Sequence, residues 1–256
     1  MQLELTFLGT GTSQGIPMIA CDCPTCTSAD PRDRRLRTSA LLSFGGRNVV
    51  IDTTPEFRLQ CLANKIRRLD AVLITHGHAD HILGMDDIRR FNQIQDEPIP
   101  IYAAPRPRQT LETIFGYSRA DRKNLNPDLP QAEFHTIDGP FELFGREFIP
   151  LALPHGRATS IGYRTGKLAY CTDLTGMPEE AFAQLDGLEV LVLGALRPSP
   201  HPAHLSFEQA IDLAQRIGAK TTYFVHMGHQ IRHADWETRL PAGIKLAHDG
   251  LKIYIR

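Results

Sequence analysis

The segment that could do the most chemistry is 75–81, with the sequence THGHADH, which carries His76, His78, Asp80 and His81. Two histidines separated by one residue point to the same side of an extended chain, and Asp80 and His81 follow where the chain turns towards an expected helix. Neutral imidazoles and carboxylates are ligands for Zn, Mn and Fe. Four ligands at this spacing can serve two neighbouring metals. The alternative is a polar loop that is rich in histidine by chance.

A second cluster is Cys21, Cys23 and Cys26, which supplies three thiolates within one short segment. A structural zinc ion commonly takes four ligands, such as three cysteines and one histidine. His229 follows His226 by three residues and is the candidate for the fourth ligand. Free, buried cysteines are the alternative. Cys61 and Cys171 stand alone and are interpreted as packing residues.

The elements that must position these residues alternate between strands and helices. Helical spacing over residues 57–68 places Leu59, Leu62, Ala63 and Ile66 on one face. The final segment, 244–256, is predicted to form a hairpin around Asp249-Gly250. Residues 105–130 mix a short helical piece with polar loop and are interpreted as a cap or a dimer arm. Strands are predicted over residues 3–11, 39–46, 48–54, 70–76, 98–104, 141–154, 160–173, 188–196 and 221–228, with further helices over 178–185 and 206–217. This pattern predicts one domain, 1–256, of the α/β or α+β class, built as a two-sheet sandwich covered by helices.

Composition limits the classes of function. The chain has 256 residues, of which 42% are hydrophobic and 22% charged, and its net charge is −1. This balance excludes a disordered chain and gives no general attraction to nucleic acid or to a membrane surface. The start of the chain lacks the pattern of a signal peptide, and no apolar run reaches the ~18 residues of a membrane span. We therefore expect a cytoplasmic protein, in which clustered cysteines favour a metal site over disulfides.

The sequence HxHxDH after an apolar strand resembles the signature of the metallo-β-lactamase superfamily, and the resemblance covers the whole chain. It implies an α+β fold, an αββα four-layer sandwich. It also implies three further ligands at later strand ends, for which His155, Asp173 and His226 are present in order. By resemblance, one metal is held by His76, His78 and His155, the other by Asp80, His81 and His226, and Asp173 bridges them. Such a pair of divalent cations, Mn or Zn, suits phosphoryl and acyl hydrolysis.

The combination of CxCxxC near residue 21 with HxHxDH near residue 76 is narrower and resembles the PhnP type of phosphodiesterase, an accessory hydrolase of phosphonate catabolism. That resemblance implies hydrolysis of 5-phosphoribosyl 1,2-cyclic phosphate or of other small phosphodiesters such as 2′,3′-cyclic nucleotides. It also implies a structural zinc on Cys21, Cys23, Cys26 and His229, a catalytic site that commonly holds manganese, and a homodimer. His204, before the helix at 206, matches the residue that assists proton transfer to the leaving oxygen. Asp80 could share this role, and nearby His201 is an alternative to His204.

The substrate implied by this resemblance is phosphorylated and needs cationic side chains. Arg157 and Arg197 are the candidates. Rival interpretations are a pyrroloquinoline quinone biosynthesis protein, a tRNA 3′-processing nuclease and a non-catalytic metal-binding protein. The balanced charge and the lack of a long basic insertion speak against the nuclease. The presence of all seven candidate ligands speaks against a non-catalytic protein.

Overall fold

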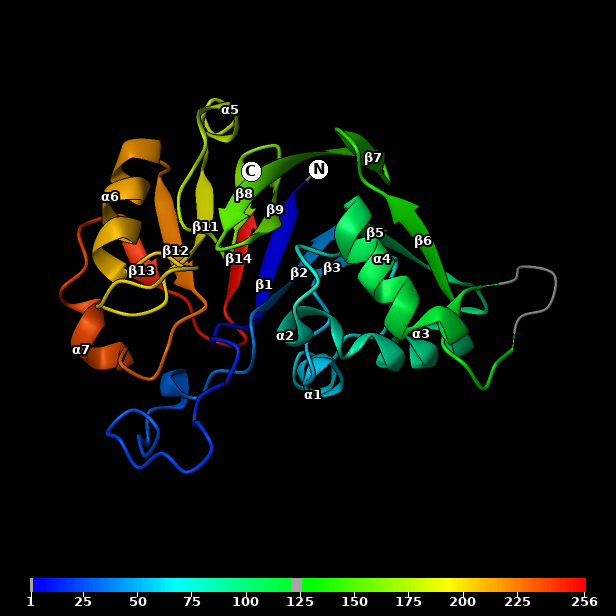
Figure 1. The fold of residues 1–256 in the computed structure, drawn as a ribbon, viewed down its shortest axis with the longest axis horizontal. Helices are drawn as coiled ribbons and strands as arrows, with labels where there is room; N and C mark the ends of the chain where they lie inside the picture. The colour runs from blue at the N-terminus through cyan, green and yellow to red at the C-terminus, as the bar shows by residue number, and fades with distance from the viewer. Residues whose placement is uncertain (1, 121–125) are drawn as a thin grey trace.

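The computed structural model describes residues 2–120 and 126–256, which contain both strands and helices throughout (Figure 1). Its strands are β1 (Leu3–Gly9), β2 (Ser39–Phe44), β3 (Arg47–Ile51), β4 (Ala71–Leu73), β5 (Ile99–Ala103), β6 (Ala132–Thr136), β7 (Phe141–Leu143), β8 (Arg146–His155), β9 (Ala158–Thr165), β10 (Leu168–Cys171), β11 (Val190–Gly194), β12 (Thr221–Val225), β13 (Ile244–Leu246) and β14 (Lys252–Ile255). Its helices are η1 (Pro31–Asp33), α1 (Phe57–Ala63), α2 (Ala79–Ile82), η2 (Met85–Ile88), α3 (Arg89–Gln95), α4 (Pro105–Ile114), η3 (Gly116–Ser118), α5 (Glu179–Phe182), α6 (Phe207–Ile217) and α7 (His233–Glu237).

The strands form two seven-stranded sheets of related design. The first has the order β14-β1-β2-β3-β4-β5-β6 and the second the order β13-β12-β11-β10-β9-β8-β7. Each combines an antiparallel part with a parallel part, and the parallel pairs run from β3 to β6 and from β10 to β13. The carboxyl ends of parallel strands lie at one edge of a sheet, which is where α/β proteins place their ligands.

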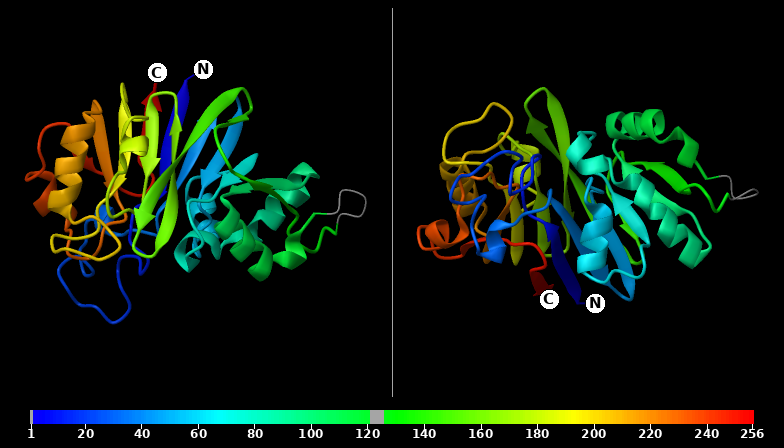
Figure 2. Two further views of the ribbon diagram at one scale, coloured as in Figure 1. Left: turned by 45° about the horizontal axis from the view of Figure 1, so that its top comes forward. Right: turned by 90° about the horizontal axis from the view of Figure 1, so that it is seen from below.

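The two sheets face each other, and helices cover the outer face of each (Figures 1 and 2). Alternation along the strands produces this layering, because successive side chains point to opposite faces. In β3, Val49 and Ile51 enter the core between the sheets, whereas Val50 packs under the first group of helices. In β11, Val192 enters the same central core, and its neighbours pack under α6. The four-layer αββα sandwich of the metallo-β-lactamase fold is therefore confirmed.

The predicted hairpin at the C-terminus is wrong. β13 pairs with β12 in the second sheet, whereas β14 pairs with β1 in the first, so Asp249 and Gly250 lie on a crossover between the sheets. Asp249 secures the crossover, because its carboxylate accepts hydrogen bonds from the Thr10 hydroxyl at 2.8 Å and from the Leu36 N–H at 2.7 Å. The crossover brings the N- and C-terminal strands side by side (Figure 2).

Helix α1 is shorter than predicted, and it buries a different face. It ends at Ala63 rather than Arg68. Leu59 and Leu62 are 50% and 61% exposed, and the buried side chains are those of Phe57, Gln60 and Cys61. Apolar spacing therefore indicated a helix but identified the wrong side of it.

Further elements differ from the predictions. The segments 141–154 and 160–173 each form two strands, separated by tight turns at Gly145 and Gly166 with positive φ. Within 105–130, helix α4 begins at Pro105, and residues 121–125 lie outside the described part of the chain. Strand β6 was not predicted. No helix of the described residues is long and apolar enough to cross a membrane.

Candidate metal centre

All seven predicted ligands follow or end strands and converge where the two sheets meet. His76 and His78 follow β4, and Asp80 and His81 lie in the short helix α2. The second sheet contributes the rest of the set: His155 ends β8, Asp173 follows β10 and His226 follows β12. The structure thus brings together groups that are up to 150 positions apart in the sequence (226 − 76).

The first group consists of three ring nitrogens that face one point. Nδ1 of His78 lies 2.9 Å from Nε2 of His76 and 3.2 Å from Nε2 of His155. His76 and His155 are buried, whereas His78 is exposed, so the group opens to solvent on one side.

Hydrogen bonds on the far side of two of these rings fix where their protons are. The Thr75 hydroxyl donates to Asp52 at 2.7 Å, so its oxygen accepts the Nδ1–H of His76 at 3.0 Å. The Nδ1 of His155 lies 2.7 Å from the carbonyl oxygen of Ala203 and must be a donor. Nε2 of both rings therefore presents a lone pair to His78, whose Nδ1 can donate to only one of them. A cation between the three nitrogens resolves this conflict.

The second group adds carboxylates. Nε2 of His81 lies 3.2 Å from Oδ2 of Asp80 and 3.4 Å from Oδ2 of Asp173. Nε2 of His226 lies 3.2 Å from the other oxygen of Asp173. Ligand atoms of His76, from the first group, and His81, from the second, both lie within 4.8 Å of the carboxylate of Asp173. This carboxylate therefore sits between the two sets of ligands. That is the position a bridging ligand needs.

The charges of these groups suit a bound cation. Burial lowers the pKa values of His76, His78 and His226, so these rings are neutral at pH 7, which is the form that binds metals. Burial opposes the charge on Asp173, but His226 and His81 outweigh burial and hold the pKa of that carboxyl well below its usual range. Burial also opposes charge on His81, but the carboxylates of Asp173 and Asp52 hold its pKa well above the usual value.

His81 provides the sharpest test of whether the residues fit a metal. Its Nε2 is buried and has no hydrogen-bond partner among the described residues. Its Nδ1 lies 2.7 Å from Asp52, so Nε2 is the atom that faces the carboxylates of Asp80 and Asp173. The raised pKa of His81 shows that this buried position favours a positive charge, either a proton on Nε2 or a metal ion bound in its place. The donor set therefore fits divalent metals.

Asp52 is a residue of the site that the sequence reasoning missed. It follows β3, is fully buried and accepts hydrogen bonds from both the backbone N–H and the hydroxyl of Thr75, besides its contact with His81. Such outer carboxylates orient histidine ligands and fix their tautomers. The only available signal was an aspartate directly after a buried strand.

Three residues of this centre have a strained backbone. Asp52, Asp173 and His226 have φ values of 64°, 53° and 60°, in the left-handed region that non-glycine residues seldom adopt. All three lie within two residues of a strand end, where the chain turns to direct a side chain at the centre. Strained conformations of this kind persist when surrounding structure enforces them, and they cluster at functional sites.

The two candidate proton donors, His204 and His201, differ in their contacts with the metal centre. Nδ1 of His204 lies 3.4 Å from Oδ1 of Asp173, and its ring stacks on His226 with a centroid distance of 4.9 Å. His201 lies further out, and its Nδ1 accepts a hydrogen bond from the N–H of Ala203. Burial, followed by the effect of His226, lowers the pKa of His204 to about 3. Burial opposes the charge of Asp80, but His81, whose Nε2 lies 3.2 Å from its carboxylate, lowers the pKa of Asp80 below its usual value, so this carboxylate stays ionised.

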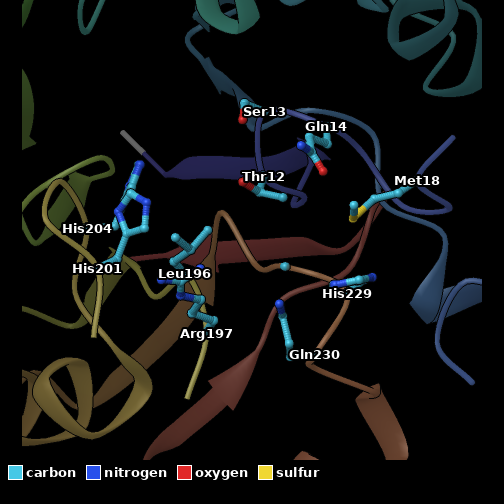
Figure 3. Close-up of a pocket in the computed structure, with 11 residues that line it drawn as sticks. Thr12, Ser13, Gln14, Met18, Leu196, Arg197, His201, His204, His229 and Gln230 are labelled. Atoms are coloured by element: carbon cyan, nitrogen blue, oxygen red, sulfur yellow. The ribbon is translucent and has the colours of Figure 1, made fainter. Parts of the chain in front are cut away.

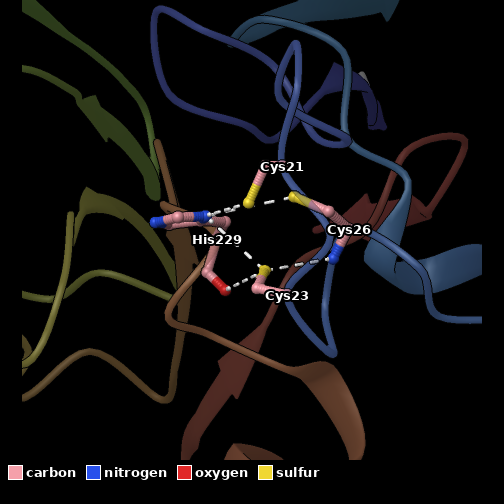
Figure 4. A group of neighbouring side chains, drawn as sticks. All are labelled: Cys21, Cys23, Cys26 and His229. Atoms are coloured by element: carbon pink, nitrogen blue, oxygen red, sulfur yellow. Dashed lines mark hydrogen bonds between the residues drawn. The ribbon is translucent and has the colours of Figure 1, made fainter.

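The three clustered cysteines lie around His229 (Figure 4). Nδ1 of His229 is 3.2 Å from the sulfur of Cys21, 3.6 Å from that of Cys23 and 4.0 Å from that of Cys26. Burial, together with a smaller contribution from the neighbouring thiols, raises the pKa of Cys26 to about 11. The three sulfurs therefore do not ionise together unless a cation lies between them, and the set matches a Cys₃His zinc site.

A cavity of about 260 Å³ lies between the cysteine group and His204 (Figure 3). Its walls come from the loop after β1 with Thr12, Ser13 and Gln14, and from the loops that carry Arg197 and His229. The loop after β1 is a tight turn, with the N–H of Gly15 bonded to the carbonyl of Thr12, and it is also a wall of the cavity.

Comparison with known proteins relates this geometry to a family. The family model described as "Beta-lactamase superfamily domain" matches residues 47–227. A crystal structure of a new diphosphatase from the PhnP family is 44% identical, covers 100% of this chain and 98% of that one, and superposes with a TM-score of 0.93. Zn(2+)-bound PqqB from Methylobacterium extorquens is 21% identical, covers 98% of this chain and 99% of its own, and has a TM-score of 0.77, which shows the shared fold alone.

One curated relative is much longer than this chain. An octanoyltransferase from Porphyromonas gingivalis is 35% identical over 258 residues, which include 99% of this chain. The chain spans 52% of that protein's length.

We predict that Asp52→Asn lowers metal affinity by ~10–100-fold while the fold is kept, because the neutral amide no longer holds the proton of His81 on Nδ1 as strongly. Asparagine tolerates the positive φ at this position. Competition with a chromogenic chelator measures the effect. Asp96→Asn, also at positive φ but outside the centre, is the matched control. Equal metal affinity in both variants would contradict the role of Asp52.

Proposed function

We propose that this chain, which belongs to the metallo-β-lactamase superfamily and within it to the PhnP family, is a metal-dependent hydrolase of small phosphodiesters, with 5-phosphoribosyl 1,2-cyclic phosphate as a model substrate. The identity of 44% to a PhnP-family diphosphatase over the whole chain supports hydrolysis of a phosphate bond. The observation that carries the proposal is the convergence of two ligand groups that share Asp173 between them.

The residues of the site have distinct roles in this proposal. His76, His78 and His155 hold one divalent cation, Asp80, His81 and His226 hold the other, and Asp173 lies between them. When bound, such a pair supplies a nucleophile at neutral pH and stabilises charge on the attacking and leaving oxygens. We infer that the metals are Mn or Zn, which these nitrogen and oxygen ligands accept.

His204 is the residue for proton transfer to the leaving oxygen. Asp173 contacts its Nδ1, which leaves Nε2 free to act on the substrate. The low pKa of His204 makes the ring neutral before substrate binds, and the negative charge of a bound phosphodiester favours its protonation. Asp80 does not share this role, since its carboxylate is ionised and lies against His81.

The group of Cys21, Cys23, Cys26 and His229 holds a structural zinc ion. This ion ties the loop after β1 to the loop after β12, which carries His226, and thereby supports one wall of the cavity in Figure 3. Homodimerisation, a cytoplasmic location and a part in phosphonate catabolism stay predictions.

The first experiment is hydrolysis of bis(p-nitrophenyl) phosphate by metal-stripped protein reloaded with Mn or Zn. We expect turnover to return with metal, and Asp173→Ala or His78→Ala to abolish it without unfolding the protein, because each removes a ligand. Circular dichroism provides the check on folding. Near-normal turnover in either variant would overturn the ligand assignment. Turnover of an octanoyl thioester in place of any phosphodiester would indicate acyl hydrolysis, as the octanoyltransferase relative suggests.

Substrates with different leaving groups can distinguish a role of His204 in proton transfer from a purely structural role. We expect His204→Ala to lower kcat by ~10²–10⁴-fold on adenosine 2′,3′-cyclic phosphate, whose alkoxide must be protonated, and far less on bis(p-nitrophenyl) phosphate. The p-nitrophenolate group leaves without a proton. His201→Ala should change both rates far less. Equal losses on both substrates would show that His204 only supports the structure.

Cys23→Ser tests the structural zinc. We expect this variant to lose one equivalent of zinc and to melt at a lower temperature, with a smaller effect on kcat, since the group is separate from the catalytic ligands. Elemental analysis and thermal unfolding measure the two quantities. Cys61→Ser, in α1, is the matched cysteine control and should keep its zinc. Unchanged zinc content in Cys23→Ser would contradict the assignment.

A further inference from the structure

A cavity of about 380 Å³ lies among the outer helices of the first sheet, away from the metal ligands. Its walls are α1, the turn that follows α1, η2 and α3, which belong to the helical layer of that sheet (Figure 1). No residue of the metal centre or of the cysteine group lines it. We call it the helix cavity. Its volume falls within the range of small-molecule sites in proteins, about 300–1,000 Å³.

The floor of the helix cavity is apolar and is fixed by packing. Phe57 and Phe91 are buried, and their ring centroids lie 6.3 Å apart. A Cβ atom on Gly84 would lie only 2.7 Å from the Cβ atom of Phe57, so α1 packs directly on the chain that leaves α2. The protein core therefore holds the floor of the cavity in place.

Apolar side chains around this floor stay exposed after folding. Leu62 and Ile94 line the cavity and are 61% and 53% exposed. The apolar spacing of residues 57–68 predicted that Leu62 faces the core, whereas it lies at the mouth of the helix cavity. Covering these side chains with an alkyl chain is favourable, since it removes apolar area from water.

Cationic side chains gather at the mouth of the helix cavity. Arg58, Lys65, Arg67 and Arg90 all line it and are exposed. Asp87 is the acidic residue among the described residues of the lining. Burial raises the pKa of Asp87, and the charge of Arg58 acts in the opposite direction, so Asp87 offsets Arg58 alone. The mouth therefore carries an excess of positive charge.

Three of these cations have no acidic partner. Within the part of the chain that the structure describes, Lys65, Arg67 and Arg90 form no ion pair, and Arg90 donates a hydrogen bond to the amide of Gln93 at 3.2 Å. The neighbouring Arg89 is by contrast paired with Asp86 at 2.8 Å. An anionic group at the mouth would accept charge-assisted hydrogen bonds from these three side chains.

The buried apolar floor and the cationic mouth together select one class of ligand. A sugar or a nucleotide would place hydroxyl and amide groups against the apolar floor, where they would lose their hydrogen bonds to water. A cationic ligand would be repelled at the mouth. A neutral hydrocarbon would leave the three cations without a partner. A molecule with an alkyl chain and one anionic head group satisfies both parts.

We propose that the helix cavity binds a single-chain anionic amphiphile, of which a medium-chain fatty acid is the simplest example. The alkyl chain packs on Phe57, Phe91 and Ile94. The carboxylate lies at the mouth, among the side chains of Lys65, Arg67 and Arg90. This site is separate from the metal centre, and it does not depend on the reaction that the metal centre catalyses.

The test is isothermal titration calorimetry of the metal-loaded protein with three amphiphiles, each below the concentration at which it forms micelles. We expect decanoate to bind at one site per chain. Octanoate should bind ~10-fold more weakly, because it buries two fewer methylene groups. Decyltrimethylammonium, which has the same chain length but a positive head group, should bind at least ~10-fold more weakly than decanoate. Equal binding of decanoate and decyltrimethylammonium would overturn the proposal.

Two variants locate the site. Arg67→Gln/Arg90→Gln should lower the affinity for decanoate by at least ~10-fold, since two charge-assisted contacts are lost. Leu62→Asp should abolish binding, because it places a carboxylate at the mouth, and its exposed position allows the protein to fold. Circular dichroism checks the fold of both variants. The matched control Arg34→Gln/Lys220→Gln removes the same charge from exposed positions outside the helix cavity and should bind like the wild type.

Other occupants of this surface would give different results. Unchanged decanoate binding in Arg67→Gln/Arg90→Gln would place the carboxylate elsewhere, such as at the catalytic metals, and would overturn the proposal. Cosedimentation with phosphatidylglycerol vesicles, without binding of free decanoate, would assign the surface to a membrane instead. A wild-type dimer that Leu62→Asp converts into a monomer, again without decanoate binding, would assign it to a second copy of the chain. Either result would also overturn the proposal.

Discussion

The structure depends on one constraint. Histidine ring nitrogens and negatively charged carboxylates face one another in one small space. Nε2 of His76, of His155 and of His81 each faces other acceptors, because the opposite nitrogen of each ring is committed to a hydrogen bond. Asp80 and Asp173 add two carboxylates to the same space. Their mutual repulsion disappears when cations bind, so metal binding and stability of the folded state are coupled.

The arrangement of the sheets makes that concentration of ligands possible. Neither sheet carries the complete set of metal ligands. The segment after β4 carries those of the first sheet, and the ends of β8, β10 and β12 carry those of the second. The buried core between the sheets fixes their separation, and well-packed interiors deform little. The strained backbone at Asp173 and His226 is then held in place by β10 and β12, the strands that precede them. A mutation that shifts one sheet against the other would disturb both ligand groups at once.

The sequence predicted which residues converge more reliably than it predicted the elements that carry them, and the reasons are physical. The spacing HxHxDH is a property of one short loop, so it can be recognised even where the surrounding strands are predicted incorrectly. Whether β14 pairs with β13 or with β1 depends on contacts far apart in the sequence, and alternation of apolar residues does not distinguish the two sheets. The exposed face of α1, and the role of Asp52 behind His81, depend likewise on neighbours that no local pattern reveals.

The metal ligands and the cationic side chains beside them belong to different parts of this fold. The ligands belong to strand ends and to the first turn of α2, where displacement by even a small distance breaks several contacts. Arg106 at the start of α4 and Arg157 in the turn after β8 line a cavity of about 390 Å³ beside His76 and His78. Changes in these two segments can therefore alter the charge of this cavity while the metal ligands stay in place. One scaffold can serve different substrates in this way, since function lives in sites that a fold supports rather than in the fold itself.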